Sequence, residues 1–265
     1  MRKLVKYTAV LTATALSSLM YPRDMLVPAA FMALVLFVFV QLWTVTYEQT
    51  GGVLIAGLTR GDLIWYLVLT ETVVLSAPRI SQKIDEEVKS GELALALVRP
   101  YNYVLYHLAR YWGEAALRLP LNFTVGATIA LAASGPPAVT PLSAAAGLVA
   151  LALALTLNFA VETAIGLAAF WFEDTMPFFW IYQKLVFSLG GLFLPLDLFP
   201  QVLAAIARFL PFAGVTYAPA RLFVSFSWEA LAWLLMVQVI WLLALGCLMA
   251  RVYTRAVRKV NIHGG

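Results

Sequence analysis

The segment Ile80-Ser-Gln-Lys-Ile-Asp-Glu-Glu-Val-Lys-Ser-Gly-Glu-Leu93 is a charged island in a chain that is apolar on both sides of it. Each charged side chain at the centre of a bilayer costs about 2.5–3.5 kcal/mol on insertion scales, so this segment cannot lie in lipid. We therefore predict an aqueous segment of helical character between two membrane spans. Such a segment is where a soluble partner can hold a membrane protein.

The composition predicts an integral membrane protein. Of the 265 residues, 62% are hydrophobic and 12% are charged, whereas a soluble domain has about 25% charged residues. The isoelectric point near 9.2 therefore reflects membrane topology, and no nucleic-acid partner is expected. Cys247, His107 and His263 stand far apart, so they provide no disulfide framework and no metal-ligand pattern.

Six membrane-spanning helices are predicted, because about 20 apolar residues cross a bilayer as a helix. The expected fold class is an all-α integral membrane protein, a single domain over residues 1–265. The spans are expected over residues 26–47, 63–77, 104–133, 142–170, 178–194 and 228–250.

The positive charges predict the orientation in the membrane. If both termini are cytoplasmic, the outer side receives only Arg60, Arg208 and Arg221, and most Lys and Arg residues lie inside, as the positive-inside rule requires. We expect a multi-pass protein of the inner (plasma) membrane. After the last span, basic residues at helical spacing are expected to bind anionic headgroups: Arg251, Arg255, Arg258 and Lys259.

Two segments outside the spans are also expected to touch the membrane. Residues 1–23 predict an interfacial helix on the cytoplasmic surface, because Thr and Ser residues dilute the apolar part. The alternative is a cleaved signal peptide. Residues 195–227 are too apolar for an ordinary loop and are broken by prolines. They predict a re-entrant or interfacial hairpin at the outer face, with a short helix over 201–210 and an irregular piece over 212–226.

Three stretches resemble the permease subunits of type-2 ABC transporters, especially a branch of small six-span bacterial permeases. The first stretch is Lys89-Ser-Gly-Glu-Leu93 with Leu97-Val-Arg-Pro100. The second is Val161-Glu-Thr-Ala-Ile-Gly-Leu-Ala-Ala-Phe-Trp171. The third is Gly190-Gly-Leu-Phe-Leu-Pro-Leu-Asp-Leu-Phe-Pro200, with Leu210-Pro-Phe-Ala213 and Tyr217-Ala-Pro219.

The resemblance implies a cytoplasmic coupling helix within residues 79–100 and an outer re-entrant hairpin. It also implies a transport subunit rather than an enzyme, forming half of the pathway of an ATP-driven exporter. Two copies of a separate ATPase would bind ATP and Mg, and a second permease chain, identical or homologous, would complete the pathway in the lipid bilayer. The chain contains no G-x-x-x-x-G-K-[ST] motif, so we expect it to bind no cofactor itself.

The charged island supplies the residues expected to couple to the ATPase. A rigid element there would carry the closure of the ATPase dimer to the spans, and Gly91 would turn the chain. The alternative is a solvated connection between two spans. The expected coupling residues are Asp85, Glu86, Glu87, Lys89, Gly91, Glu92 and Arg99.

The expected third span carries a polar stripe at spacings of three or four residues, about 22 Å long at 1.5 Å per residue. Its members are His107, Arg110, Glu114, Arg118 and Asn122. Two interpretations of the stripe remain open. Either the first half of this helix lies at the cytoplasmic interface, or the stripe is a polar surface that contacts the substrate.

Glu71 and Glu162 are expected near the bilayer midplane. An ionisable residue at that depth suggests a functional site. Arg118 or a proton could neutralise either one, and Asn158 stands one turn from Glu162. A structural hydrogen bond explains these residues equally well. With His107 and the rest of the stripe, they form the expected translocation pathway.

At the outer face, Pro195, Asp197 and Pro200 predict either an exit gate or a turn that closes the bundle. Two alternative functions remain open from the sequence. A self-contained ion-coupled transporter or channel would use Glu71 and Glu162 as ion sites. A membrane-embedded enzyme is disfavoured, because neither H-E-x-x-H nor G-x-S-x-G occurs.

Overall fold

A computed structural model of the chain describes residues 2–52, 54–99 and 101–263. The described residues are mostly helical and contain no strand. The α-helices are α1 (Arg2–Ser18), α2 (Pro22–Thr50), α3 (Arg60–Ser76), α4 (Ile80–Lys89), α5 (Glu92–Val98), α6 (Tyr103–Ser134), α7 (Pro141–Leu167), α8 (Met176–Leu189), α9 (Gln201–Phe209), α10 (Pro211–Val215), α11 (Tyr217–Val224) and α12 (Trp228–His263). Two short 3-10 helices are η1 (Ala168–Phe170) and η2 (Leu196–Leu198).

Five segments in the described part of the chain are long and apolar enough to span a membrane. They are Pro22–Thr50, Arg60–Lys89, Tyr103–Ser134, Pro141–Phe170 and Trp228–Tyr253. The helices in these segments cover five of the six expected spans. The expected span over 178–194 is different, because α8 has only 14 residues and ends at Leu189. Its length of about 21 Å falls short of an apolar core of about 30 Å.

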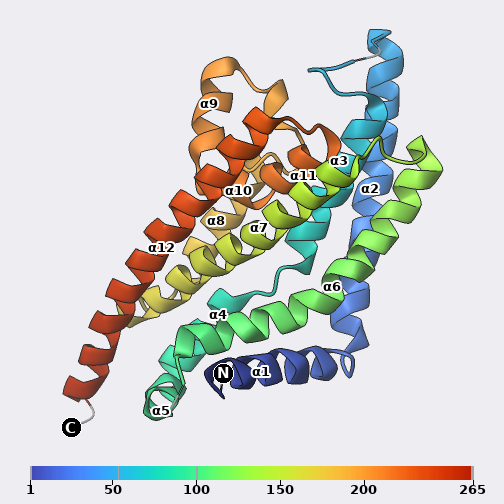
Figure 1. Ribbon diagram of the computed structural model, residues 1–265. Helices are drawn as coiled ribbons and strands as arrows, with labels where there is room; N and C mark the ends of the chain where they lie inside the picture. Colours follow the sequence, from blue (N-terminus) through green and yellow to red (C-terminus); the bar gives the residue numbers. More distant parts are fainter. Residues whose placement is uncertain (1, 53, 100, 264–265) are drawn as a thin grey trace.

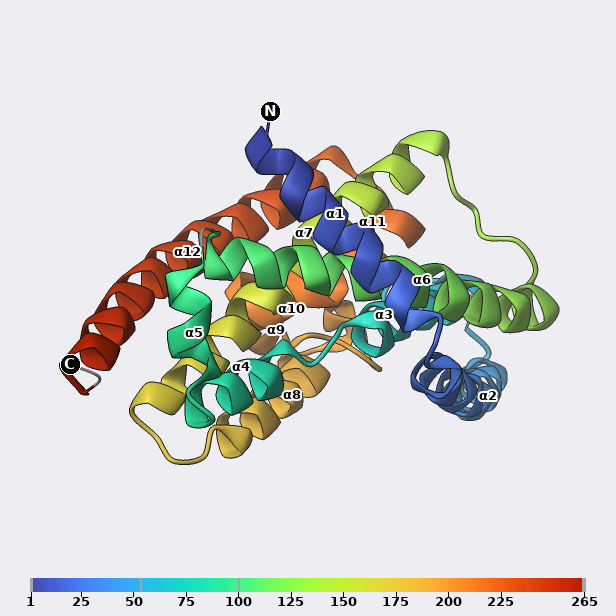
Figure 2. The same ribbon diagram turned by 90° about the horizontal axis from the view of Figure 1, so that it is seen from below.

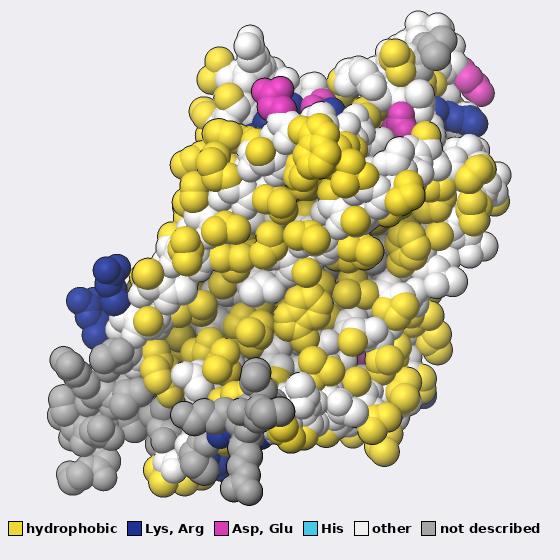
Figure 3. Space-filling model, in the orientation of Figure 1, with side chains coloured by type: hydrophobic (Ala, Val, Ile, Leu, Met, Phe, Trp, Pro, Cys, Tyr) yellow, Lys and Arg dark blue, Asp and Glu magenta, His cyan; other side chains and the backbone are white. Residues whose placement is uncertain are grey.

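The long helices run between two ends of the molecule (Figure 1). Helices α4 and α5 lie at one end together with both chain termini, and α9 lies at the other. Seen from below, α2 is viewed along its axis and α1 lies across the same end of the bundle (Figure 2). The space-filling view shows mostly hydrophobic side chains between the ends, with charged side chains gathered near them (Figure 3).

Helix α6 bends near its middle (Figure 1), and Pro120 lies inside the helix. A proline removes a backbone hydrogen bond and kinks a helix at that point. The part before the bend lies along α1, and the backbone N–H of Asn102 donates to Tyr7 Oη at 3.0 Å. The first half of the expected polar stripe therefore lies near the end of the molecule.

Helix α7 is the central element of the packing, with α12, α11 and α4 against it. Buried Ala146, Ala150 and Ala154 let neighbouring helices approach closely. Residues 212–226, expected to be irregular, are largely helical as α10 and α11, and Ala213, Ala218 and Ala220 are buried. The short helix expected over 201–210 is α9.

Candidate functional site

Helices α4 and α5 form the charged island, and a turn at Ser90 and Gly91 separates them. Gly91 has φ of +79°, a conformation that glycine adopts without steric cost. The expected helical character and the expected turn are both present. Pro100, expected at the entry to the third span, lies outside the described residues.

The N-terminus of α4 is capped by a carboxylate from α7. Arg79, the residue before α4, makes no side-chain cap. Instead, the backbone N–H and the Oγ of Ser81 both donate to Glu162 Oε2 at 3.3 Å. A carboxylate at a helix N-terminus accepts from orphan N–H groups and interacts favourably with the helix dipole. Glu162 thus fixes α4 to the membrane helix α7.

The same carboxylate continues into a buried polar network. Asn158 Nδ2 donates to Glu162 Oε1 at 3.0 Å and to the Tyr111 hydroxyl at 3.0 Å. The Tyr182 hydroxyl donates to Asn158 Oδ1 at 2.7 Å. We call Ser81, Tyr111, Asn158, Glu162 and Tyr182 the Glu162 network. It joins α4, α6, α7 and α8, and all five residues are buried.

Helix α4 also packs very closely on α7 at Gly166, one turn beyond Glu162. A Cβ atom on Gly166 would lie 2.7 Å from Ile84 Cβ and 2.8 Å from the Ser81 carbonyl oxygen. Only glycine leaves room for α4 at this distance. Glu162 and Gly166 therefore seat α4 on α7 through a hydrogen-bonded contact and a close steric contact.

A second set of contacts holds α4 to α6. Glu87 Oε2 accepts from the Tyr103 hydroxyl at 2.7 Å and lies 3.0 Å from His107 Nε2. Asp85 pairs with Lys89 at 2.6 Å and accepts from Thr175 Oγ1 at 2.8 Å. Two of the expected coupling residues, Asp85 and Glu87, are thus turned toward the protein.

The other expected coupling residues form an accessible surface. Glu86 is exposed on α4, Glu92 is exposed at the start of α5, and Arg99 is exposed at its end. Lys89 is also exposed, beside Asp85. This surface lies at the same end of the molecule as both termini (Figure 1).

A cavity of about 990 Å³ lies beside the Glu162 network, and we call it the bundle cavity. Asn158, Glu162 and Tyr182 contribute to its wall, as do Glu114 and Arg118 of the expected pathway. Arg118 Nη2 lies 3.4 Å from Glu114 Oε2. The structure therefore brings four of the expected pathway residues to one cavity.

The remaining expected pathway residues lie elsewhere. His107 is held by Glu87, Arg110 lies over the Tyr106 ring at 5.8 Å, and Asn122 Nδ2 donates to Ser76 Oγ at 2.9 Å. Glu71 is only 2% exposed, and its Oε1 has no hydrogen-bond partner within the described residues. The polar stripe is thus divided among separate environments.

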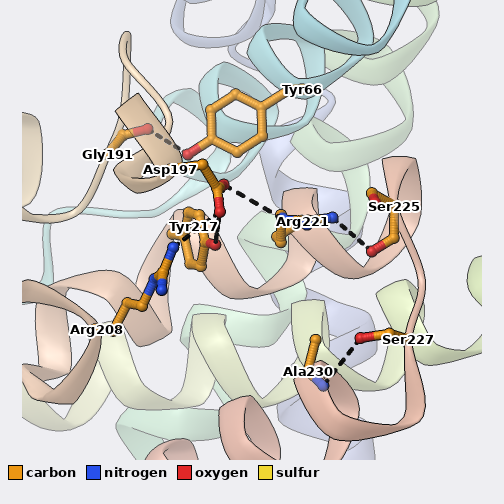
Figure 4. A network of polar contacts seen from close by, with 9 residues as sticks. All are labelled: Tyr66, Gly191, Asp197, Arg208, Tyr217, Arg221, Ser225, Ser227 and Ala230. Atoms are coloured by element: carbon orange, nitrogen blue, oxygen red, sulfur yellow. Dashed lines mark hydrogen bonds and ion pairs between the residues drawn. The ribbon is translucent and has the colours of Figure 1, made fainter. Parts of the chain in front are cut away.

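Asp197 is the centre of a polar cluster at the opposite end (Figure 4). It accepts from Arg208 at 2.8 Å and from the Tyr217 hydroxyl at 3.0 Å, and it lies 3.4 Å from Arg221 Nε. These contacts tie η2, α9 and α11 together, with Pro195 and Pro200 on either side of η2.

Sequence reasoning missed several partners in these networks. Nothing in the sequence indicated that Ser81, Tyr111 and Tyr182 contact Asn158 or Glu162, and tyrosines are common at membrane interfaces without such a role. Tyr217 did stand in a quoted motif, Tyr217-Ala-Pro219. Its role as a donor to Asp197 depends on the folding of α11 toward η2.

The described part of the chain is thus an α-helical protein of the multi-pass membrane class, with a short charged helix fixed to its central apolar helix. The sequence profile of the family described as ABC-2 family transporter protein matches residues 30–264. The chain belongs to this family. None of the curated proteins compared with it matches in sequence.

Family membership makes the chain a membrane component of an ABC transporter. It is a transport component in a lipid bilayer, and its partner is an ABC ATPase. The resemblance seen in the sequence motifs is therefore confirmed.

Proposed function

We propose that this chain is the permease subunit of an ATP-driven exporter and forms half of its translocation pathway. Two copies of a separate ATPase would bind Mg and hydrolyse ATP. A second permease chain, identical or homologous, would complete the pathway. The observation that carries the proposal is the capping of α4 by Glu162, because the network around this carboxylate reaches the bundle cavity.

In this proposal α4 and α5 are the coupling segment. The ATPase contacts exposed Glu86, Glu92 and Arg99. A movement of α4 passes to α7 through Glu162 and Gly166, since these two residues seat the helix. Asn158 then links that movement to α6 and α8. Closely packed elements move as units rather than deforming continuously.

The position of the bundle cavity supports export. Its wall includes Arg23 and Arg79, which stand beside the helices at the α4 end of the molecule. Most of the basic residues of the chain also belong to that end in the expected topology, so it is the cytoplasmic end by the positive-inside rule. A cavity near that end is placed to receive substrate from the inner leaflet or the cytoplasm, and both termini would be cytoplasmic in the plasma membrane.

In this proposal the sixth crossing of the membrane is built from several short helices and not from one long helix. Helix α8 alone is short, but the chain continues through η2 to α11, and α10 and α11 are buried against α7. Backbone that is not part of a spanning helix is tolerated at membrane depth only within protein shelter, and this packing supplies it. The segment fits a re-entrant hairpin that closes the outer end, with the Asp197 cluster holding its turns together.

Affinity purification of the full chain in mild detergent tests this function. We expect an ABC ATPase to copurify in stoichiometric amount, and any second permease chain to appear with it. The double variant Glu86→Lys with Glu92→Lys should lose the ATPase at least tenfold. The control Glu48→Lys, on an exposed position of α2, should retain it.

Recovery of the chain alone, from preparations that preserve other membrane complexes, would contradict the proposal. It would favour an ion-coupled transporter. Retention of the ATPase by the double variant would leave an ATPase partner in place but would refute α4 and α5 as its binding segment.

A further inference from the structure

A second cavity, of about 550 Å³, lies between α1, α2 and α6, and we call it the interfacial cavity. Its lining includes Ser17 and Ser18 of α1 and Tyr106 and Arg110 of α6. Asp24, Glu114 and Arg118 line both this cavity and the bundle cavity. The two cavities are therefore neighbours, and the Glu114–Arg118 pair stands where they meet.

Arg118 has unused donors at this junction. A guanidinium carries five N–H donors, and the contact of Arg118 with Glu114 is long, at 3.4 Å. Its Nε is buried and has no hydrogen-bond partner among the described residues. An unpaired buried donor costs about 1–3 kcal/mol, and a planar guanidinium suits a phosphate or another oxyanion. The side chain is thus prepared for an anionic ligand.

The charges around the two cavities also favour an anion. The described lining contains four arginines, namely Arg23, Arg79, Arg110 and Arg118. It contains three carboxylates, those of Asp24, Glu114 and Glu162. The four guanidinium groups therefore exceed the three carboxylates by one.

The rest of the bundle cavity is lined mainly by apolar side chains, together with Gln82 and Gln183. Val27 and Phe31 of α2 line it on one side, and Val186 and Phe187 of α8 on another. Phe31 is more than half exposed, so this side of the cavity opens at the surface of the bundle rather than inside a sealed core. Apolar walls next to a cationic junction match a ligand with an anionic head and an apolar tail.

We propose that the two cavities together bind an anionic amphiphile, with the head at Arg118 and the tail between α2 and α8. This inference rests on the proposed function, because it names the class of cargo that the permease would carry. The ligand adjoins the Glu162 network that seats α4, so the binding site and the coupling segment share a wall. Membrane phosphatidylglycerol and a soluble alkyl sulfate carry the same chemistry.

Photo-crosslinking of the purified full chain in a neutral detergent tests the inference without the ATPase. The probe is phosphatidylglycerol with a diazirine in its acyl tail, and labelled peptides are identified by mass spectrometry. We expect labelling of α2 and α8. Excess unlabelled phosphatidylglycerol or decyl sulfate should reduce it at least tenfold, whereas phosphatidylcholine of the same acyl chains and inorganic phosphate should not.

Arg118→Gln should lower this labelling about tenfold, and Arg118→Lys, which keeps the charge, should lower it severalfold. Arg251→Gln is the matched control, because Arg251 is an exposed arginine of α12 and would affect only surface lipid. If Arg118→Gln does not fold, as judged by its melting temperature, the lysine variant and the competitors still decide the matter.

Three results would overturn the inference. They are equal labelling by phosphatidylcholine and phosphatidylglycerol probes, equal effects of Arg118→Gln and Arg251→Gln, and competition by inorganic phosphate alone. Competition by decyl sulfate without phosphatidylglycerol would uphold the site but assign it a soluble amphiphile. A separate affinity purification that recovers the ATPase keeps a failure here distinct from a failure of the proposed function.

Discussion

Glu162 illustrates how a carboxylate is retained inside an apolar bundle. It is 4% exposed, and a charged group in that setting is costly unless it is hydrogen-bonded. Ser81 donates to one oxygen twice and Asn158 donates to the other. Both oxygens therefore act as acceptors, which explains why the position carries an acid.

Glu162→Gln should weaken the attachment of α4 to α7. A glutamine side chain has one acceptor oxygen, so its NH2 group must face either the Ser81 donors or the Asn158 donor. The loss of a hydrogen bond to a charged acceptor is about 1.5–3 kcal/mol. We expect a lower midpoint in denaturant unfolding of the chain in detergent and less copurified ATPase.

Glu71→Gln is the matched control for this change. Glu71 is equally buried, but its Oε1 has no partner among the described residues, so the amide displaces no known hydrogen bond there. The stability loss should be clearly smaller than for Glu162→Gln. Equal losses for the two variants would contradict the capping role of Glu162.

The sequence alone identifies those site residues that are isolated polar side chains within apolar segments. Glu162, Asn158 and Arg118 stand out against their neighbours, and the structure brings them to one cavity. Their partners Tyr111 and Tyr182 could not be found in this way. Which tyrosine meets Asn158 depends on the packing of α6 and α8 against α7, which leaves no local pattern.

At the level of elements, α4 depends on its steric fit against α7. Gly166→Ala places a Cβ atom 2.7 Å from Ile84 Cβ and 2.8 Å from the Ser81 carbonyl. Overpacking of this kind costs about 1–3 kcal/mol. We expect a lower melting temperature in detergent and weaker ATPase copurification.

Gly246→Ala provides the comparison, because a Cβ atom there meets no atom within 4 Å. Alanine is also the better helix former, so this variant should be as stable as the parent or slightly more so. A Gly166→Ala protein that matches it in melting temperature would refute the close seating of α4.

Hydropathy predicted the positions of the long helices correctly, but it predicted a longer helix over 178–194 than the structure contains. Five predicted spans match helices because long apolar runs allow few other structures in lipid. The run 178–194 is also largely apolar, yet α8 stops at Leu189 and Gly191 follows with φ of +73°. Apolarity carries no information about such a turn. The bend in α6 near Pro120 likewise redirected the polar stripe that a straight helix would present.

The whole molecule has two ends with an apolar band between them (Figures 1 and 3). One end has α4, α5 and both termini, and the other has α9 and the Asp197 cluster. Family membership supplies an ATPase partner. We propose that this ATPase binds the α4–α5 end.

Site-specific photo-crosslinking in cells that express the chain with its ATPase tests this claim most directly. A photoreactive amino acid would replace Glu92, exposed at the start of α5, or Glu229, exposed at the start of α12. We predict a covalent adduct with the ATPase from position 92 and none from position 229. Absence of the adduct at position 92 in a well-expressed variant, or equal adducts from both positions, would contradict the account.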